Sequence, residues 1–236
     1  MTVSIHQPSY FPWLGWLHKV IHSDTFILMN DVQLTDSSYQ HRNIFLTRDG
    51  QEKYLNIGIK KKGYKDISLK DIELLPVVKW QNEHRKFLQA NYAKHPYYNE
   101  VMGYVEPIFT NEYNTLGEVL KDVTEIVWRL FDIKTALVYQ HELEYDKAAR
   151  KGDLVIELVK AVKGNIYLSG QGAKAYQDEA DFERNNIRLV YQQFKHPEYT
   201  QLNTGGNPGN FKAGISCLDL LFNEGFDVSR KILNGI

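Results

Sequence analysis

The sequence predicts an α/β protein with a doubly wound, mainly parallel sheet, and two features of its pattern support this prediction. Residues 3–6 are a short strand candidate and residues 25–30 an almost wholly apolar one, on either side of a helix predicted over residues 13–23. Residues 134–192 then alternate regularly between strand and helix. Parallel neighbours need a crossover of this kind, because the chain must return to the same end of the sheet.

The alternating segment supplies most of the expected sheet. Its strands are predicted over residues 135–139, 165–169 and 187–192, and its helices over 153–162 and 172–185. Gly164 is expected to end the first of these helices. With the two strands near the N-terminus, the segment predicts one continuous sheet.

Two insertions interrupt this pattern. Residues 37–75 are expected to be strand-rich, with Lys60, Lys61 and Lys62 at a solvated hairpin tip or a phosphate-gathering loop. Residues 76–131 are expected to be helical. Their clearest helix starts at Thr115, which with Glu118 matches a capping box and precedes a continuous apolar face.

Composition limits the class of protein. The chain has 236 residues, 43% of them hydrophobic, and is expected to form a single domain over residues 1–236. A net charge of -1 argues against a nucleic-acid partner. The single cysteine excludes a disulfide framework and Cys-cluster metal sites, and no leader or long apolar segment is evident. We therefore expect a cytoplasmic protein without membrane insertion and without a bound metal.

A candidate site follows from the predicted sheet. His6 and Asp31 end two consecutive strands, and ligands of open α/β sheets bind beyond the carboxyl ends of the strands. His6 is the candidate general base and Asp31 its orienting partner, while the guanidinium of Arg42 suits a diphosphate or carboxylate. The alternative is a partly buried histidine, a turn-forming aspartate and a surface ion pair.

A second set of candidates follows the last predicted strands. The Ser169-Gly170 turn could hold a phosphate at a helix start, and His196 is the second catalytic candidate. Aromatic and polar side chains could bind the rest of a ligand, although core packing is the simpler explanation for most aromatic residues. The substrate-binding candidates are Gln7, Tyr10, Trp13, Gln33, Tyr39, Arg42, Asn43, Ser169, Gly170, Tyr176, Tyr199 and Gln201.

Several runs of residues resemble the signature of WbqC-like proteins. The longest is HQPSYFPWLGWLHK over residues 6–19, and it is unusual enough to be specific. The others span residues 23–26, 31–33, 38–43, 167–170 with Tyr176, 193–201 and 216–225. One departure is the Gly/Asn-rich loop at residues 203–210, where a shorter connection is expected before the C-terminal helix.

The resemblance implies an enzyme of bacterial surface-polysaccharide (O-antigen) assembly. The expected reaction is N-acyl or aminoacyl transfer to the amine of a nucleotide-linked amino sugar. The donor would be a thioester of coenzyme A or of an acyl carrier protein, and no resident cofactor is expected.

Two other functions remain open. One is a nucleotide-sugar binding or scaffolding protein without catalysis. The other is a nucleotidylyltransferase-like enzyme, because the first strand leads through a proline-containing loop to a helix. Against it, Gly15-Trp16 stands where that class needs Gly-His, and His18 comes later.

Overall fold

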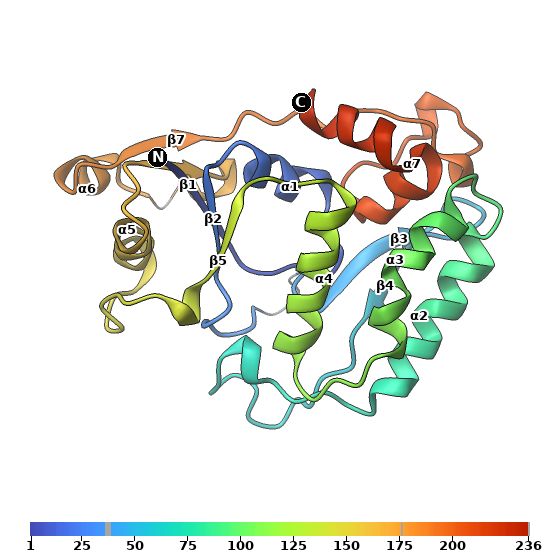
Figure 1. Ribbon diagram of the computed structural model, residues 1–236, viewed down its shortest axis with the longest axis horizontal. Helices are drawn as coiled ribbons and strands as arrows, with labels where there is room; N and C mark the ends of the chain where they lie inside the picture. The colour runs from blue at the N-terminus through green and yellow to red at the C-terminus, as the bar shows by residue number, and fades with distance from the viewer. Residues whose placement is uncertain (36–38, 176, 236) are drawn as a thin grey trace. The chain divides into compact units, whose positions relative to one another are not determined.

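The chain folds into two compact units, which are described separately (Figure 1). The computed structural model describes residues 1–35, 39–175 and 177–235. Unit 1 comprises residues 1–7, 15–31 and 134–195, and unit 2 comprises residues 8–14, 32–133 and 196–236. The expectation of one domain over residues 1–236 stays a prediction.

Unit 1 contains the predicted parallel sheet. Its strands are β1 (Thr2–His6), β2 (Thr25–Leu28), β5 (Ala136–Tyr139), β6 (Ile166–Ser169) and β7 (Arg188–Tyr191). They run in the order β5-β2-β1-β6-β7, and every neighbouring pair is parallel. The chain winds from β1 outward to β5 and then returns to β6 on the other side of β1. The strand order therefore reverses between β1 and β6.

Helices cover both faces of this sheet, as the doubly wound prediction requires. They are α1 (Leu14–Ile21), α5 (Lys151–Ala161) and α6 (Glu179–Arg184). Val3 and Ile5 of β1 belong to a buried apolar cluster that includes side chains of α5 and α6. Ser4 points to the other face, where its hydroxyl donates to the Lys19 carbonyl of α1 at 3.2 Å.

One predicted helix is shorter than expected. Residues 172–185 contain a 3-10 turn, Gln171–Ala173, followed by α6. Asp178 starts α6 as its N-cap, because its side chain accepts from the Ala180 amide at 3.0 Å. At the end of α5, a Cβ on Gly164 would lie 2.4 Å from Val3, so the glycine permits close packing of the turn on β1.

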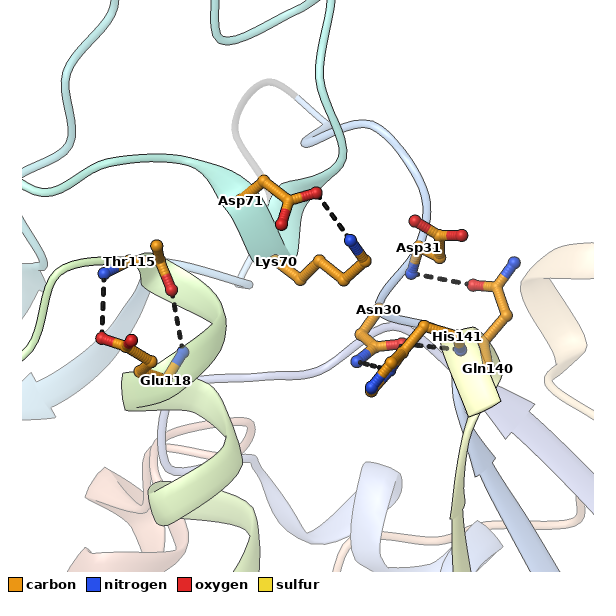
Figure 2. A network of polar contacts seen from close by, with 8 residues as sticks. All are labelled: Asn30, Asp31, Lys70, Asp71, Thr115, Glu118, Gln140 and His141. Carbon is orange, nitrogen blue, oxygen red and sulfur yellow. Dashed lines mark hydrogen bonds and ion pairs between the residues drawn. The ribbon is translucent and has the colours of Figure 1, made fainter. Parts of the chain in front are cut away.

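Unit 2 holds the two predicted insertions and the C-terminal helix. An antiparallel hairpin of β3 (Arg42–Leu46) and β4 (Glu52–Asn56) forms a sheet of its own. The helices are α2 (Val77–Tyr92), α3 (Tyr98–Thr110), α4 (Leu116–Leu130) and α7 (Cys217–Asn234). The predicted capping box is present at α4, where Thr115 and Glu118 bond reciprocally (Figure 2).

The C-terminal helix α7 bends. Ser216 is its N-cap and accepts from the Leu218 amide at 3.3 Å. Gly225 interrupts the helix with a φ of 71°, and a Cβ there would lie 2.7 Å from the Tyr97 ring. None of the helices in the described part of the chain has the length and apolarity needed to cross a bilayer.

Candidate functional site

A cavity of about 650 Å³ opens in unit 1 where the strand order reverses. His6 and Gln7 reach it from the end of β1, and Ser169 and Gly170 reach it from the end of β6. In open parallel sheets this switch point is the usual ligand site, because the connections on its two sides leave in opposite directions. The volume also falls in the range of small-molecule pockets. Four of the predicted site residues therefore line one cavity.

The His6 ring is held in one tautomer. Its Nδ1 lies 2.9 Å from the Gln7 carbonyl oxygen, which also accepts from Trp16 Nε1 at 3.1 Å. That oxygen can only accept, so Nδ1 carries the proton and Nε2 keeps a lone pair. Neighbouring protein atoms and then the charge of Lys19 lower the pKa of His6, although the residue is exposed to solvent at the cavity. Solvent in the open cavity limits the size of this shift but not its direction, so the ring is neutral at pH 7.

Lys19 is a cavity residue that the sequence-based prediction missed. Its side chain lines the cavity, although the residue is only 4% exposed. Nζ donates to the Ile5 carbonyl at 3.0 Å, and no described carboxylate contacts it. Burial lowers the pKa of Lys19 to about 8. The signal was present in the sequence, since Lys19 is the one lysine in the otherwise largely apolar helix LGWLHKVI.

Small residues expose backbone along the cavity wall. Gly152, Gly170 and Gly172 line the cavity, and a Cβ added to any of them would meet no other atom within 4 Å. Gly152 lies in the first turn of α5, where backbone N–H groups have no intrahelical partner. Ser169 is fully buried, and its hydroxyl donates to Gln177 Oε1 at 2.8 Å. The wall thus has room and donors for a polar ligand.

Asp31 follows β2 and bonds to the segment that follows β5. Its backbone N–H donates to Gln140 Oε1 at 3.0 Å, and the preceding Asn30 bonds to His141 (Figure 2). These partners follow β5, on the far side of β2 from β1. Hydrogen bonds therefore hold the segment after β2 next to the segment after β5. Asp31 is not among the described residues that line the cavity, and its role as the orienting partner of His6 stays a prediction.

Three other candidates lie in unit 2, where the structure gives them internal partners. The amide of Asn43, fully buried, donates to the carbonyls of Tyr10 and Phe11 at 3.0 and 2.6 Å. Tyr10 is 1% exposed and its hydroxyl lies 2.9 Å from His84 Nδ1. Gln33 donates to the Lys65 carbonyl at 2.7 Å. The amide of Asn43 thus fixes the proline-rich loop, and contact of these three with a substrate stays a prediction.

Arg42 and the aromatic candidates also lie in unit 2. The guanidinium of Arg42 stacks over Tyr54, 4.5 Å from the ring centroid, and Tyr39 is 40% exposed. Trp13 stacks on His196 with ring centroids 6.5 Å apart. Burial lowers the pKa of His196. Their roles in ligand binding or catalysis stay predictions, and Tyr176 lies outside the described residues.

Tyr199 and Gln201 belong to a buried network around Asp219. The Asp219 carboxylate accepts from the hydroxyls of Tyr92 and Tyr199 at 3.0 and 2.9 Å, and from the Gln201 amide at 3.1 Å. Gln201 also bonds both ways with the Lys212 backbone, which closes the loop over residues 202–211. This arrangement gives both candidates a structural role, and contact with a ligand stays a prediction.

Other reactive side chains are engaged elsewhere. His18 Nδ1 lies 2.9 Å from the Gln192 amide, and its ring stacks on His22. Burial raises the pKa of the Cys217 thiol, which disfavours the thiolate needed of a nucleophile. Among the described residues there is no group of three or more potential metal ligands.

Comparison with known proteins identifies relatives but no reaction. The model of the WbqC-like protein family matches residues 7–231. The "Uncharacterized protein Rv1507c" of Mycobacterium tuberculosis is 27% identical over 225 residues, which cover 94% of each chain. No solved structure gives a significant match.

Proposed function

The chain belongs to the WbqC-like protein family, and from this premise we propose that it is an N-acyl or aminoacyl transferase of bacterial surface-polysaccharide (O-antigen) assembly. The substrate would be a nucleotide-linked amino sugar, and the donor a thioester of coenzyme A or of an acyl carrier protein. The reaction would take place in the cavity of unit 1, in the cytoplasm.

One observation carries the proposal. A neutral imidazole with an available Nε2 lone pair lines a ligand-sized cavity at the switch point of a parallel sheet. A neutral histidine can accept a proton from an attacking amine, whereas an imidazolium cannot. Gln7 supports this role, because its carbonyl fixes the tautomer of His6.

The proposed step uses His6 twice. The sugar amine attacks the thioester carbonyl carbon, and His6 Nε2 takes the proton that the nitrogen loses as the C–N bond forms. The tetrahedral intermediate then collapses, the C–S bond breaks, and the imidazolium returns the proton to the leaving thiolate. Backbone N–H groups near Gly170 and Gly172 are candidates for stabilising the oxyanion.

The test compares two histidine variants of the full chain. His6→Ala should lose transfer activity by about 100-fold or more, as for loss of a general base, while its melting temperature and ligand binding persist. His22→Ala, at an exposed position just after the end of α1 and outside the cavity, is the matched control and should retain activity. Unchanged turnover in folded His6→Ala would exclude the proposed base.

Substrate is found first by thermal-shift screening with nucleotide-linked amino sugars, because a ligand that binds only the native state raises its melting temperature. Binding without transfer from any thioester would instead favour the binding or scaffolding function.

Nucleotidylyl transfer is a second candidate, favoured by the way β1 leads through its proline-containing loop to α1 at the switch point. The position of His18 speaks against it, because this side chain bonds to Gln192 and is not among the described residues of the cavity wall. Release of pyrophosphate from ATP or CTP in the presence of a sugar phosphate would support this function over acyl transfer.

A further inference from the structure

We infer that Lys19 binds a phosphoryl oxyanion of the ligand in the unit 1 cavity. This inference deepens the proposed function and rests on it for the identity of the ligand. Two sources supply the same chemistry: the diphosphate of a nucleotide-linked sugar and the phosphates of a coenzyme A donor.

The first argument is the incomplete pairing of a buried charge. An ammonium group has three donors, and the described partner of Lys19 Nζ is one carbonyl, that of Ile5. Removing a charge from water is costly unless it is paired, and buried lysines are therefore usually matched by a carboxylate. Here the remaining donors have only the cavity in which to find an anion.

The second argument is the charge of the cavity wall. Two lysines, Lys19 and Lys151, line the cavity, whereas its described wall contains neither aspartate nor glutamate. Lys151 is exposed and lies at the first residue of α5, where the helix dipole also favours negative charge. His6 adds no charge at pH 7. The field in the cavity is therefore positive.

The third argument is space. Gly152, Gly170 and Gly172 leave the wall open, so that a phosphoryl group can approach backbone N–H groups closely. No packing reason in the structure requires Gly172 to lack a Cβ, and its φ is not in the left-handed region. A ligand that occupies this space would explain why glycines stand at these three positions of the wall.

Anion binding to Lys19 should also be accompanied by a measurable uptake of protons. Since burial holds the pKa of Lys19 at about 8, part of the population is neutral at pH 8.5. A bound anion favours the ammonium form and raises its pKa, so binding at pH 8.5 should take up protons. The lowered pKa of His6 keeps that ring neutral in this range, so the proton uptake is assigned to Lys19.

Isothermal titration calorimetry tests the inference with three probes: uridine 5′-diphosphate, coenzyme A and inorganic phosphate. Lys19→Met should weaken the probe that binds wild type by at least tenfold and abolish proton uptake at pH 8.5, measured in buffers of different ionisation enthalpy. Lys151→Met should have a smaller effect. Lys160→Met, near the other end of α5 and paired with Glu157, is the matched control and should bind normally.

The probes separate the two sources, because binding of the diphosphate alone identifies the nucleotide and binding of coenzyme A alone identifies the donor. Gly172→Leu provides a variant that keeps Lys19 and projects into open space, and it should fold normally but lose binding.

Wild-type affinity in folded Lys19→Met, or no binding of any probe to wild type, would overturn the inference. Loss of transfer in His6→Ala does not bear on it, so failure of the proposed base and failure of the anion site are distinguishable.

Discussion

Lys19 in unit 1 and Asp219 in unit 2 are both buried ionisable side chains, but they differ in their partners. Asp219 is fully buried and accepts hydrogen bonds from Tyr92, Tyr199 and Gln201. Lys19 is 4% exposed and has one described partner, a carbonyl, on the wall of a cavity. On the inference drawn above, the fully hydrogen-bonded charge of Asp219 serves the fold, whereas the incompletely paired charge of Lys19 beside a cavity serves a ligand.

The largest expected effect on the free energy of unfolding comes from removing the Asp219 carboxylate. Asp219→Ala removes the shared acceptor of Tyr92, Tyr199 and Gln201 at a fully buried site and should lower the free energy of unfolding by about 3–5 kcal/mol, although Gln201 keeps its bond to the Lys212 carbonyl. Chemical denaturation monitored by circular dichroism measures this change. Asp227→Ala on the same helix is the control, because its side chain is 91% exposed and its contact with Arg230 is long, at 3.8 Å. Equal effects of the two variants would contradict the comparison.

Removal of the incompletely paired Lys19 ammonium should instead raise the free energy of unfolding. Lys19→Met keeps most of the side-chain volume and removes a buried charge, so the free energy of unfolding at pH 7 should rise by on the order of 2 kcal/mol. Because folding lowers the pKa of Lys19 to about 8, the folded wild type loses its proton first as the pH increases. The gain should therefore shrink above pH 8. Destabilisation by Lys19→Met across this range would show that the ammonium supports the fold.

The two tyrosines that donate to Asp219 should differ in how much their hydroxyls stabilise the fold. Tyr199→Phe removes one hydrogen bond to the carboxylate and should cost about 1.5 kcal/mol. Tyr92→Phe should cost about 1 kcal/mol more, because its hydroxyl also accepts from the Leu46 amide at 2.8 Å and the change leaves that amide without this partner. Urea denaturation of the two variants measures the difference, and a larger cost for Tyr199→Phe would refute this order.

The sequence predicted what depends on local pattern. Strand and helix alternation predicted the parallel sheet, and the spacing of Thr115 and Glu118 predicted the capping box, because these features arise from neighbouring residues. His6 and Ser169 could be placed in one site because strand ends meet at one edge of a parallel sheet.

Features that depend on distant residues could not be predicted in this way. The position of Asp31 is fixed by Gln140, which follows a strand more than 100 residues later. Lys19 was missed because the sequence does not state which face of α1 packs on the sheet. The bonds of the Asn43 amide to the carbonyls of a loop about 30 residues earlier likewise depend on residues that are distant in the sequence.

The smallest expected change in the free energy of unfolding concerns the N-cap of α4, and the larger changes can be compared with it. Thr115→Ala removes an N-cap hydrogen bond at a partly exposed helix start and should cost about 1 kcal/mol in the free energy of unfolding. Glu118→Gln retains a side-chain acceptor for the Thr115 amide and should cost less. Water can replace the partner at an exposed cap but not at Asp219. If Thr115→Ala were as damaging as Asp219→Ala, burial would not be what separates these sites, and the argument from the unsatisfied charge of Lys19 would lose its basis.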